Sequence, residues 1–435
     1  MLEPHVIEKI KKSAVYFDDK AYDILLEKIN DAQIVLLGEA THGTHEFYDI
    51  RIKITKKLIL EKNFNAIAIE GDWPDAYTIN SYINNNEIKN AQEALQSFDR
   101  FPTWMWQNIP MLHCTEWLKN HNQQKNNHVN FYGLDLYSLY RSIDAIVMCL
   151  EKIDPHIAQE VKDNYSCLEQ FRHDPTAYGY SLFSQLSQSC RNEVIEELKK
   201  LKELEWKLVQ EKKATPDEAF YLVQNARVIK NSEAYYRSLF LDEVNNWNLR
   251  DSHMMETLEE IVKHYQKNGI NKPKIVVWAH NSHIGNSAAT QMSNNGEFNI
   301  GQLVKEKFGN NSYSLGFTTY NGTVSAASNW HMPVERKNIK NALPNSYEDL
   351  FHNVEISKFL LTLEDKDLVP KQLLERAIGV IYAPQTERQS HYFYASLADQ
   401  FDAVIHYDTT TALEPLAKTV RWIAGEVPET YPSGL

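Results

Sequence analysis

Short, mostly apolar runs recur along the chain, and most of them end next to a small or polar residue. They cover residues 34–37, 66–69, 131–134, 275–279, 378–381 and 403–405. Apolar runs of this length without alternation predict strands that are buried on both faces. Between the first two runs, Phe47, Ile50, Ile54 and Leu58 keep the spacing of an amphipathic helix. A helix between two buried strands is a βαβ unit, so we expect an α/β fold with flanking helices around a largely parallel sheet.

The middle of the chain lacks such runs and shows helical spacing of its apolar residues instead. Within it, Thr-Pro-Asp-Glu at 215–218 has the pattern of a capping box with proline at the first helical position. We therefore predict a long helical insertion over residues 143–267. A second irregular segment, 327–375, predicts a small α+β subdomain. The insertion would interrupt a discontinuous α/β core made of residues 1–142 and 268–435.

Polar residues follow four of the predicted strands at the point where each strand ends. In open α/β sheets, ligands bind outside the carboxyl ends of the strands. We therefore expect these polar side chains to meet at one edge of the sheet, where they would form a site. They are Glu39, His42, Glu70, Asp135, His280 and His283.

Composition narrows the class of protein. The formal net charge of −13 over 435 residues disfavours nucleic acid and anionic membranes as partners, because both carry negative charge. No apolar run approaches the ~20 residues that span a bilayer, and the N-terminus has no signal-like apolar segment. The four cysteines, at 114, 149, 167 and 190, contain no CxxC pair and predict neither a disulfide framework nor a zinc knuckle. We expect a cytoplasmic protein with a small-molecule substrate.

The turn Gly-Glu-Ala-Thr-His-Gly at 38–43 is the strongest candidate for chemistry. A neutral imidazole such as that of His42 can take a proton from water, and Glu39 and Glu70 could orient and charge-stabilise it. A structural alternative is that His42 caps the following helix and that Glu39 pairs with a cation. Arg51, on that helix, could pair with Glu70 or hold a substrate oxygen.

The remaining candidates would bind the substrate. His280 and His283 could polarise a carbonyl, although with the first cluster they could also form a divalent-metal shell. Trp104 belongs to a group of aromatic residues that could line a cleft, with core packing as the alternative. Arg250 and Asp251 are predicted to open a helix, with Asp251 as its N-cap and Arg250 as a ligand contact.

Several enzyme classes lack their signatures in this sequence. There is no GxSxG elbow, no GxxxxGK[ST] loop and no GxGxxG after a strand, which disfavours serine α/β-hydrolases, P-loop NTPases and dinucleotide enzymes. Hydrolysis by an activated water, without a cofactor or a metal, is then the simplest chemistry. Two alternatives stay open, namely a metal-dependent hydrolase using the same Glu/His cluster and a non-catalytic protein that binds a bulky small molecule.

Six motifs along nearly the whole chain resemble those of the erythromycin esterase family. The motif that opens with Leu-Gly-Glu-Ala-Thr-His-Gly also resembles the sites of a wider superfamily that includes Tiki-type metalloproteases. Members of the esterase family share the site without all acting on macrolides, and some carry the label succinoglycan biosynthesis protein. The six motifs occupy residues 37–47, 68–72, 101–106, 250–254, 278–283 and 386–392.

The resemblance implies an α/β core with a helical insertion and metal-independent hydrolysis of a macrolactone ester. His42 matches the motif histidine that acts as general base on water, and Glu39 and Glu70 match the acidic residues that assist it. The resemblance further matches Arg51, Glu46, His280 and His283 to motif positions, and we expect these four residues to bind the substrate or stabilise the oxyanion.

Overall fold

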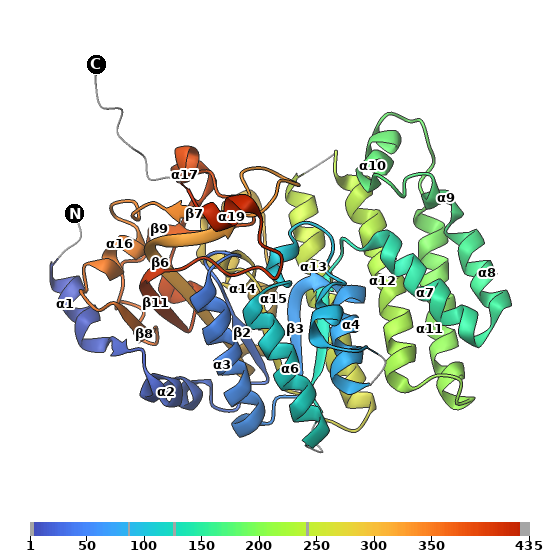
Figure 1. Cartoon of the computed structure of the whole chain (residues 1–435), viewed down its shortest axis with the longest axis horizontal. Helices are drawn as coiled ribbons and strands as arrows, with labels where there is room; N and C mark the ends of the chain where they lie inside the picture. The colour runs from blue at the N-terminus through green and yellow to red at the C-terminus, as the bar shows by residue number, and fades with distance from the viewer. Residues whose placement is uncertain (1–3, 86–87, 125–127, 241–242, 427–435) are drawn as a thin grey trace.

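A computed structural model describes residues 4–85, 88–124, 128–240 and 243–426, and a central β-sheet organises most of them (Figure 1). The order of its strands is β1-β8-β11-β6-β2-β5-β3-β4, and β7 pairs with β6. The strands are β1 (Val15–Tyr16), β2 (Ile34–Leu37), β3 (Ala66–Asp72), β4 (Asn130–Asp135), β5 (Ile275–Trp278), β6 (Ser312–Ala326), β7 (Glu335–Ile339), β8 (Lys358–Thr362) and β11 (Ala403–Thr410), while β9 (Leu373–Arg376) and β10 (Tyr392–Ala395) form a separate pair.

Parallel pairing dominates the sheet, as the sequence predicted. The strands from β11 through β6, β2, β5 and β3 to β4 are all parallel to their neighbours. Antiparallel pairing occurs where β8 meets β11, where β1 meets β8 and where β7 meets β6. The parallel strands therefore present their carboxyl ends at one edge, where ligands bind in such sheets.

Helices cover the sheet on both faces. They are α1 (Pro4–Ser13), α2 (Asp19–Ile29), α3 (His45–Lys62), α4 (Trp73–Asn84), α5 (Ala91–Leu95), α6 (Ile109–Gln124), α7 (Leu139–Ile153), α8 (Pro155–Asn164), α9 (Ser166–Glu169), α10 (Pro175–Phe183), α11 (Arg191–Gln210), α12 (Pro216–Ser238), α13 (Glu243–Lys267), α14 (Asn281–Ile284), α15 (Ile300–Phe308), α16 (Tyr347–His352), α17 (Glu387–Ser390), α18 (Leu397–Gln400) and α19 (Val420–Ala424). No helix within the described ranges is both long and apolar enough to cross a membrane.

The two faces of the sheet belong to two hydrophobic cores. In β2, Val35 and Leu37 pack into the core that contains residues of α2, α3 and α6. Ile34 and Leu36 pack into the opposite core, with residues of α13, α15 and α16. Alternate side chains of a strand point to opposite faces, so a strand covered on both sides needs apolar residues at every position. This explains the uninterrupted apolar run in the sequence.

The helices α7 to α12 form one end of the molecule, at the right of Figure 1. They have a hydrophobic core of their own, and α12 begins with the capping box between Thr215 and Glu218 that the sequence indicates. Both β7 and β8, which lie in the segment 327–375, extend the main sheet. The division of the chain into a core, an insertion and a subdomain stays a prediction.

Two predictions about strands are wrong. The run 378–381 forms no strand, since Ile378 and Ile381 make only isolated bridges, to Thr41 and Ala327 respectively. The central strand β6 was not predicted, because hydroxyl-bearing residues interrupt its apolar pattern. Their hydroxyl groups are satisfied locally, as when Ser325 donates to the carbonyl of Leu413 at 2.5 Å.

A disulfide joins Cys167 in α9 to Cys190, the residue before α11. The expectation of no disulfide is therefore wrong at this pair. The two cysteines are 23 residues apart, and the packing of the helices brings them together. The Tyr178 hydroxyl accepts the backbone N–H of Cys190 at 2.9 Å, which fixes the start of α11 against α10. Linear spacing does not reveal such a contact.

Gly43 offers a test of how closely the turn after β2 packs against the sheet. A Cβ atom at Gly43 would lie 1.8 Å from the Ser325 carbonyl oxygen, whereas one at Gly379 would have nothing within 4 Å. We expect Gly43→Ala to lower the free energy of unfolding by about 1–3 kcal/mol, because backbone of β6 must move. Gly379→Ala, the control, should stay within about 0.5 kcal/mol of the parent. Denaturant unfolding measures both, and equal stability of the two variants would contradict the packing.

Candidate active site

The turn after β2 places His42 at the edge of the sheet with one ring nitrogen already engaged. His42 Nδ1 lies 2.8 Å from Glu39 Oε1, and Arg51 Nη2 donates to Glu39 Oε2 at 2.6 Å. Glu39 and Arg51 are almost completely buried. An ionised carboxylate only accepts hydrogen bonds, so Nδ1 carries the proton and Nε2 keeps its lone pair. The row Arg51–Glu39–His42 thus fixes both the orientation and the tautomer of the imidazole.

Glu70, near the end of β3, faces the free nitrogen of His42. Its Oε1 lies 3.9 Å from His42 Nε2, and its Oε2 accepts the backbone N–H of His280 at 2.8 Å. Burial alone would raise the pKa of Glu70, but His283, His42 and Arg250 around it hold the pKa well below its usual range. Glu70 is therefore an ionised carboxylate at neutral pH.

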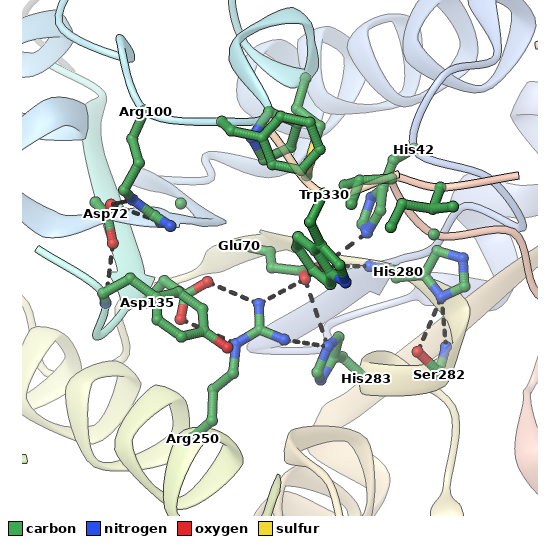
Figure 2. A pocket seen from close by; sticks show the side chains of 18 of the residues that line it. His42, Glu70, Asp72, Arg100, Asp135, Arg250, His280, Ser282, His283 and Trp330 are labelled. Atoms are coloured by element: carbon green, nitrogen blue, oxygen red, sulfur yellow. Dashed lines mark hydrogen bonds and ion pairs between the residues drawn. The ribbon is translucent and has the colours of Figure 1, made fainter. Parts of the chain in front are cut away.

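Arg250, on α13, supplies the cation that buried carboxylates at this edge require. It donates to Asp135 through Nε at 3.0 Å and through Nη2 at 2.7 Å, and Nη2 also donates to Glu70 at 2.7 Å. Burial opposes ionisation of Asp135, yet Arg250 lowers the pKa of that carboxyl below its usual value. Figure 2 shows Arg250 reaching between Glu70, Asp135 and His283.

His283 is held by the same arginine and by a second carboxylate. Arg250 Nη1 lies 2.8 Å from His283 Nε2, and a guanidinium only donates, so Nε2 accepts in the neutral ring. His283 Nδ1 then donates to Asp251, whose two oxygens both lie 3.0 Å away. Burial lowers the pKa of His283, but Asp251 and Glu70 raise it above its usual value. The ring of Trp247 stacks on His283 with centroids 4.6 Å apart.

His280 is a neutral histidine beside His42. Its Nδ1 accepts the backbone N–H of Ser282 at 3.2 Å, so its proton resides on Nε2. That Nε2 is buried and has no hydrogen-bond partner of standard geometry among the described residues, although the backbone of Ala40 interacts with the ring. Burial and the neighbouring His42, whose ring centroid is 4.8 Å away, lower the pKa of His280 to about 3.

A cavity of about 720 Å³ opens over these groups. Its polar floor consists of the strand-end residues, and its walls are largely aromatic. Trp330, with 63% of its surface exposed, projects over the site in Figure 2. Helices α10 and α12 contribute Thr176, Tyr235 and Tyr236 to the side that faces the sheet edge. One cavity therefore combines titratable groups from the sheet with contacts from the helical end of the molecule.

The structure gathers most of the predicted site residues. His42, Glu70, Arg250, His280 and His283 line the cavity, and Glu39 and Arg51 lie directly behind His42. The predicted pairing of Arg51 with Glu70 is replaced by its contact with Glu39.

Two predicted binding residues lie elsewhere. Glu46 accepts the backbone N–H and the hydroxyl of Thr411, both at 2.8 Å, and so anchors the start of α3. Trp104 packs in a separate core beside Phe101, with ring centroids 5.4 Å apart. Neither is among the described residues that line the cavity. The predicted role of Trp104 falls instead to Trp106, Trp247 and Trp330.

The prediction for Asp251 is also wrong. Helix α13 is already formed at Glu243, so Asp251 lies inside it and its carboxylate accepts the backbone N–H of Ile300 at 2.8 Å. The sequence reasoning missed Trp247 and Tyr137. Trp247 lies three positions before Arg250, which places both on one face of a helix and could have revealed it. Tyr137, two residues after Asp135, stacks under the guanidinium of Arg250 at 5.2 Å.

The donors at this site do not form a metal shell. Within the described ranges, no group of three or more His, Cys, Asp or Glu side chains could hold a metal ion. Glu70 and Asp135 are bound by Arg250, and His283 lies between Arg250 and Asp251. The guanidinium thus occupies the position between the carboxylates that a cation would take.

Comparisons with known proteins agree on one family. The family model described as erythromycin esterase matches residues 59–410, a range that begins after Glu39 and His42. The putative hydrolase YbfO of Bacillus subtilis (strain 168) is 22% identical over 333 residues, covering 70% of this chain and 68% of that protein. Erythromycin esterase type II of Escherichia coli is 20% identical over 335 residues, covering 74% and 77%.

Solved structures with the same fold carry two different names. A succinoglycan biosynthesis protein superposes with a TM-score of 0.74 at 20% identity and covers 96% of this chain and 99% of its own. A mutant of the erythromycin esterase EreC in its open conformation gives a TM-score of 0.67 at 18% identity and covers 92% and 97%. At these identities the likeness establishes the α/β fold.

Removing the guanidinium of Arg250 tests the electrostatics of the site. We expect Arg250→Met to lower the free energy of unfolding by about 3–5 kcal/mol, since two carboxylates lose their buried partner. In the parent, the lowered pKa of Asp135 stabilises the fold above the unfolded pKa of about 4, and this stabilisation is lost on acidification. In Arg250→Met, burial raises the pKa of the Asp135 carboxyl. The free energy of unfolding of this variant therefore falls as pH rises.

The stability difference between parent and Arg250→Met should therefore widen from about pH 5 to about pH 8. Thermal unfolding at several pH values measures it. Arg172→Met is the matched control, because Arg172 also binds two carboxylates, those of Glu169 and Asp144, but near the surface. It should cost less than about 1 kcal/mol. A difference that narrows with rising pH would contradict the ionised state of these carboxylates.

Proposed function

The chain belongs to the erythromycin esterase family, and from this premise we propose that it hydrolyses an ester bond, a macrolide lactone being one candidate, with water that His42 activates. The family and the putative hydrolase among its relatives make the chain a hydrolase. The ester substrate and the role of His42 are the proposal.

The observation that carries the proposal is the fixed tautomer of His42. The Nδ1–H group donates its hydrogen bond to Glu39, so the basic Nε2 is directed at the cavity, where Glu70 Oε1 lies 3.9 Å away. A water molecule between these two atoms can donate one hydrogen bond to each of them. Both acceptors then polarise the O–H bonds of this water, which makes its oxygen more nucleophilic toward an ester carbonyl.

The charges around His42 favour the proton transfer that this chemistry needs. When water attacks, His42 Nε2 takes its proton, and the resulting imidazolium lies between the carboxylates of Glu39 and Glu70. Because the pKa of Glu70 is held low, Glu70 remains charged and stabilises that cation. Collapse of the tetrahedral intermediate breaks the ester C–O bond, and the imidazolium returns the proton to the leaving alkoxide.

One donor at the cavity, on Arg250, can stabilise the negative oxygen of the intermediate. Arg250 commits four of its five N–H groups to Glu70, Asp135 and His283, which leaves one on Nη1 without a partner among the described residues. His280 Nε2 is fully buried, so His280 contributes a neutral ring beside His42 rather than a donor to the intermediate. His283 acts indirectly by holding Arg250.

Substitution of His42 tests this mechanism directly. On an ester of a broad ester and lactone panel that the parent turns over, we expect His42→Gln to reduce kcat by about 10²–10⁴-fold, the usual contribution of a general base. His45→Gln is the matched control, since His45 begins α3 and is absent from the cavity lining within the described part of the chain. It should retain parent activity. Mass spectrometry of the product should show the addition of one water to the substrate.

Three outcomes would contradict the proposal. Full activity of His42→Gln would exclude His42 as the base. Turnover that is lost on chelation and restored by a stoichiometric metal would indicate a metal-dependent hydrolase. Tight binding of erythromycin or of another panel member, without any conversion of any member, would indicate a protein that sequesters its ligand.

A further inference from the structure

The backbone around His42 is supported by a segment more than 330 residues away in the sequence. Strand β2 ends at Leu37, and beyond it Ala40 and His42 pair with Ile378. Ile378 donates its N–H to the Ala40 carbonyl at 2.8 Å, and its own carbonyl accepts the N–H of His42 at 3.3 Å. These two hydrogen bonds bracket Thr41, so a movement of Ile378 would move the backbone that carries the His42 ring.

Ile378 is in turn fixed by a fully buried arginine two residues earlier. Arg376, at the end of β9, donates through Nη1 to the carbonyls of Thr319 and Tyr320 at 3.2 and 2.9 Å. Its Nη2 donates to the Lys340 carbonyl at 2.9 Å. The guanidinium therefore joins β9 to the middle of β6 and to the residue after β7.

The charge of Arg376 is balanced by Glu387, the first residue of α17. Arg376 Nε lies 3.2 Å from Glu387 Oε1, which also accepts the Tyr382 hydroxyl at 3.0 Å. Glu387 is 5% exposed, so both partners of the pair are buried. A second buried carboxylate, that of Glu348, lies near Arg376 and accepts its backbone N–H at 2.9 Å, but Glu387 is the one that forms an ion pair with the guanidinium. Loss of Glu387 therefore weakens the compensation of a buried charge, and its surroundings rearrange to solvate it.

The segment 377–383 is clamped at both of its ends by the same motif. The backbone carbonyl of His391 accepts the N–H of Ala377 at 2.8 Å, and the ring Nε2 of His391 accepts the N–H of Ala383 at 2.9 Å. Between these anchors, Gly379, Val380 and Ile381 line the cavity. One short segment thus provides both a cavity wall and the backbone support of His42.

We propose that Arg376 and Glu387 are positioning residues for the chemistry at His42. The inference rests on the proposed role of His42 as general base, although neither residue contacts the cavity. The buried pair holds 377–383 against the turn after β2, so that His42 Nδ1 stays within hydrogen-bond distance of Glu39 and Nε2 stays opposite Glu70. This gives a structural role to Glu387 in the motif Thr-Glu-Arg-Gln-Ser-His-Tyr at 386–392, whose Ser390 and His391 also line the cavity.

Glu387→Gln tests the proposal against a closely matched control. Glu233 in α12 has similar partners, since its Oε1 accepts a tyrosine hydroxyl, from Tyr178 at 2.6 Å, and an arginine Nε, from Arg237 at 3.0 Å. It also accepts the Ser189 hydroxyl at 3.1 Å. Glu233→Gln therefore removes an equivalent buried carboxylate far from Ile378. The measurement is nitrogen NMR of the histidine rings, with the His42 signals identified by their loss in His42→Gln, because these shifts report which ring nitrogen carries the proton.

We expect His42 of the parent and of Glu233→Gln to be protonated on Nδ1 alone, and His42 of Glu387→Gln to show a mixture of tautomers. On a panel ester that the parent turns over, kcat of Glu387→Gln should fall by about tenfold or more while KM changes less, because a small misplacement of the base affects the chemical step. Glu387→Asp, which retains the charge, should restore part of kcat.

An unchanged His42 spectrum in Glu387→Gln would overturn the positioning role, whatever its activity. If Glu387→Gln does not fold, Tyr382→Phe replaces it, because this variant removes the tyrosine hydrogen bond to Glu387. A mixture of His42 tautomers in Tyr382→Phe would then support the positioning role, and an unchanged His42 spectrum would overturn it. Equal changes of the His42 ring nitrogen shifts in Glu387→Gln and Glu233→Gln would also overturn the positioning role. Both changes would then reflect a general loss of stability rather than an effect transmitted through Ile378. The absence of ester turnover in the parent would refute the proposed function alone, because the tautomer is read without substrate.

Discussion

The structure depends on the burial of carboxylates at the carboxyl edge of a parallel sheet. A sheet covered on both faces leaves little water at this edge, and an unpaired carboxylate there is costly. Glu39 is therefore matched to Arg51 of α3, Glu70 to Arg250 of α13, and Asp72 to Arg100 of the segment after α5. This requirement determines where α3 and α13 cross the edge, and the same charges control the protonation of the histidines between them.

Arg51 shows how completely that requirement shapes the interior. Its guanidinium lies over the rings of Tyr48 and Trp278, at 4.4 and 5.2 Å from their centroids, and it makes one ion pair, with Glu39. Aromatic faces offer partial compensation to a cation that has few hydrogen-bond acceptors. The large apolar residues next to the site therefore do more than fill space, since they allow a full charge to be placed behind the proposed base.

The sequence was sufficient for the parts of the molecule that local patterns encode. Continuous apolar runs identified β2, β3, β4, β5 and β11, and the residues after four of them indicated the site. Strand β6 was not predicted because its hydroxyl-bearing residues interrupt the apolar pattern. The fold tolerates them because cross-strand partners satisfy the hydroxyl groups, as in the contact between Thr318 and His406 at 2.9 Å. The run 378–381 was misread for the opposite reason, since its apolar residues face a cavity and an adjacent turn rather than two neighbouring strands. Trp104 and Trp330 are indistinguishable by composition, and only tertiary packing separates a core residue from one at the cavity.

The arrangement separates the proposed chemistry from the recognition of the substrate. The charged floor comes from strand ends that are locked by parallel pairing, so its geometry changes little without disruption of the sheet. The opposite wall comes partly from α10 and α12, whose contacts with the cavity, such as Tyr235 and Tyr236, belong to a separate hydrophobic core. The described residues on that wall make no hydrogen bond to Glu39, His42 or Arg250, and Tyr235 reaches Arg250 only through Tyr137, whose ring it contacts with centroids 5.4 Å apart. Related chains could therefore retain one hydrolytic centre while they accept different substrates, which is consistent with the different names of the proteins that share this fold.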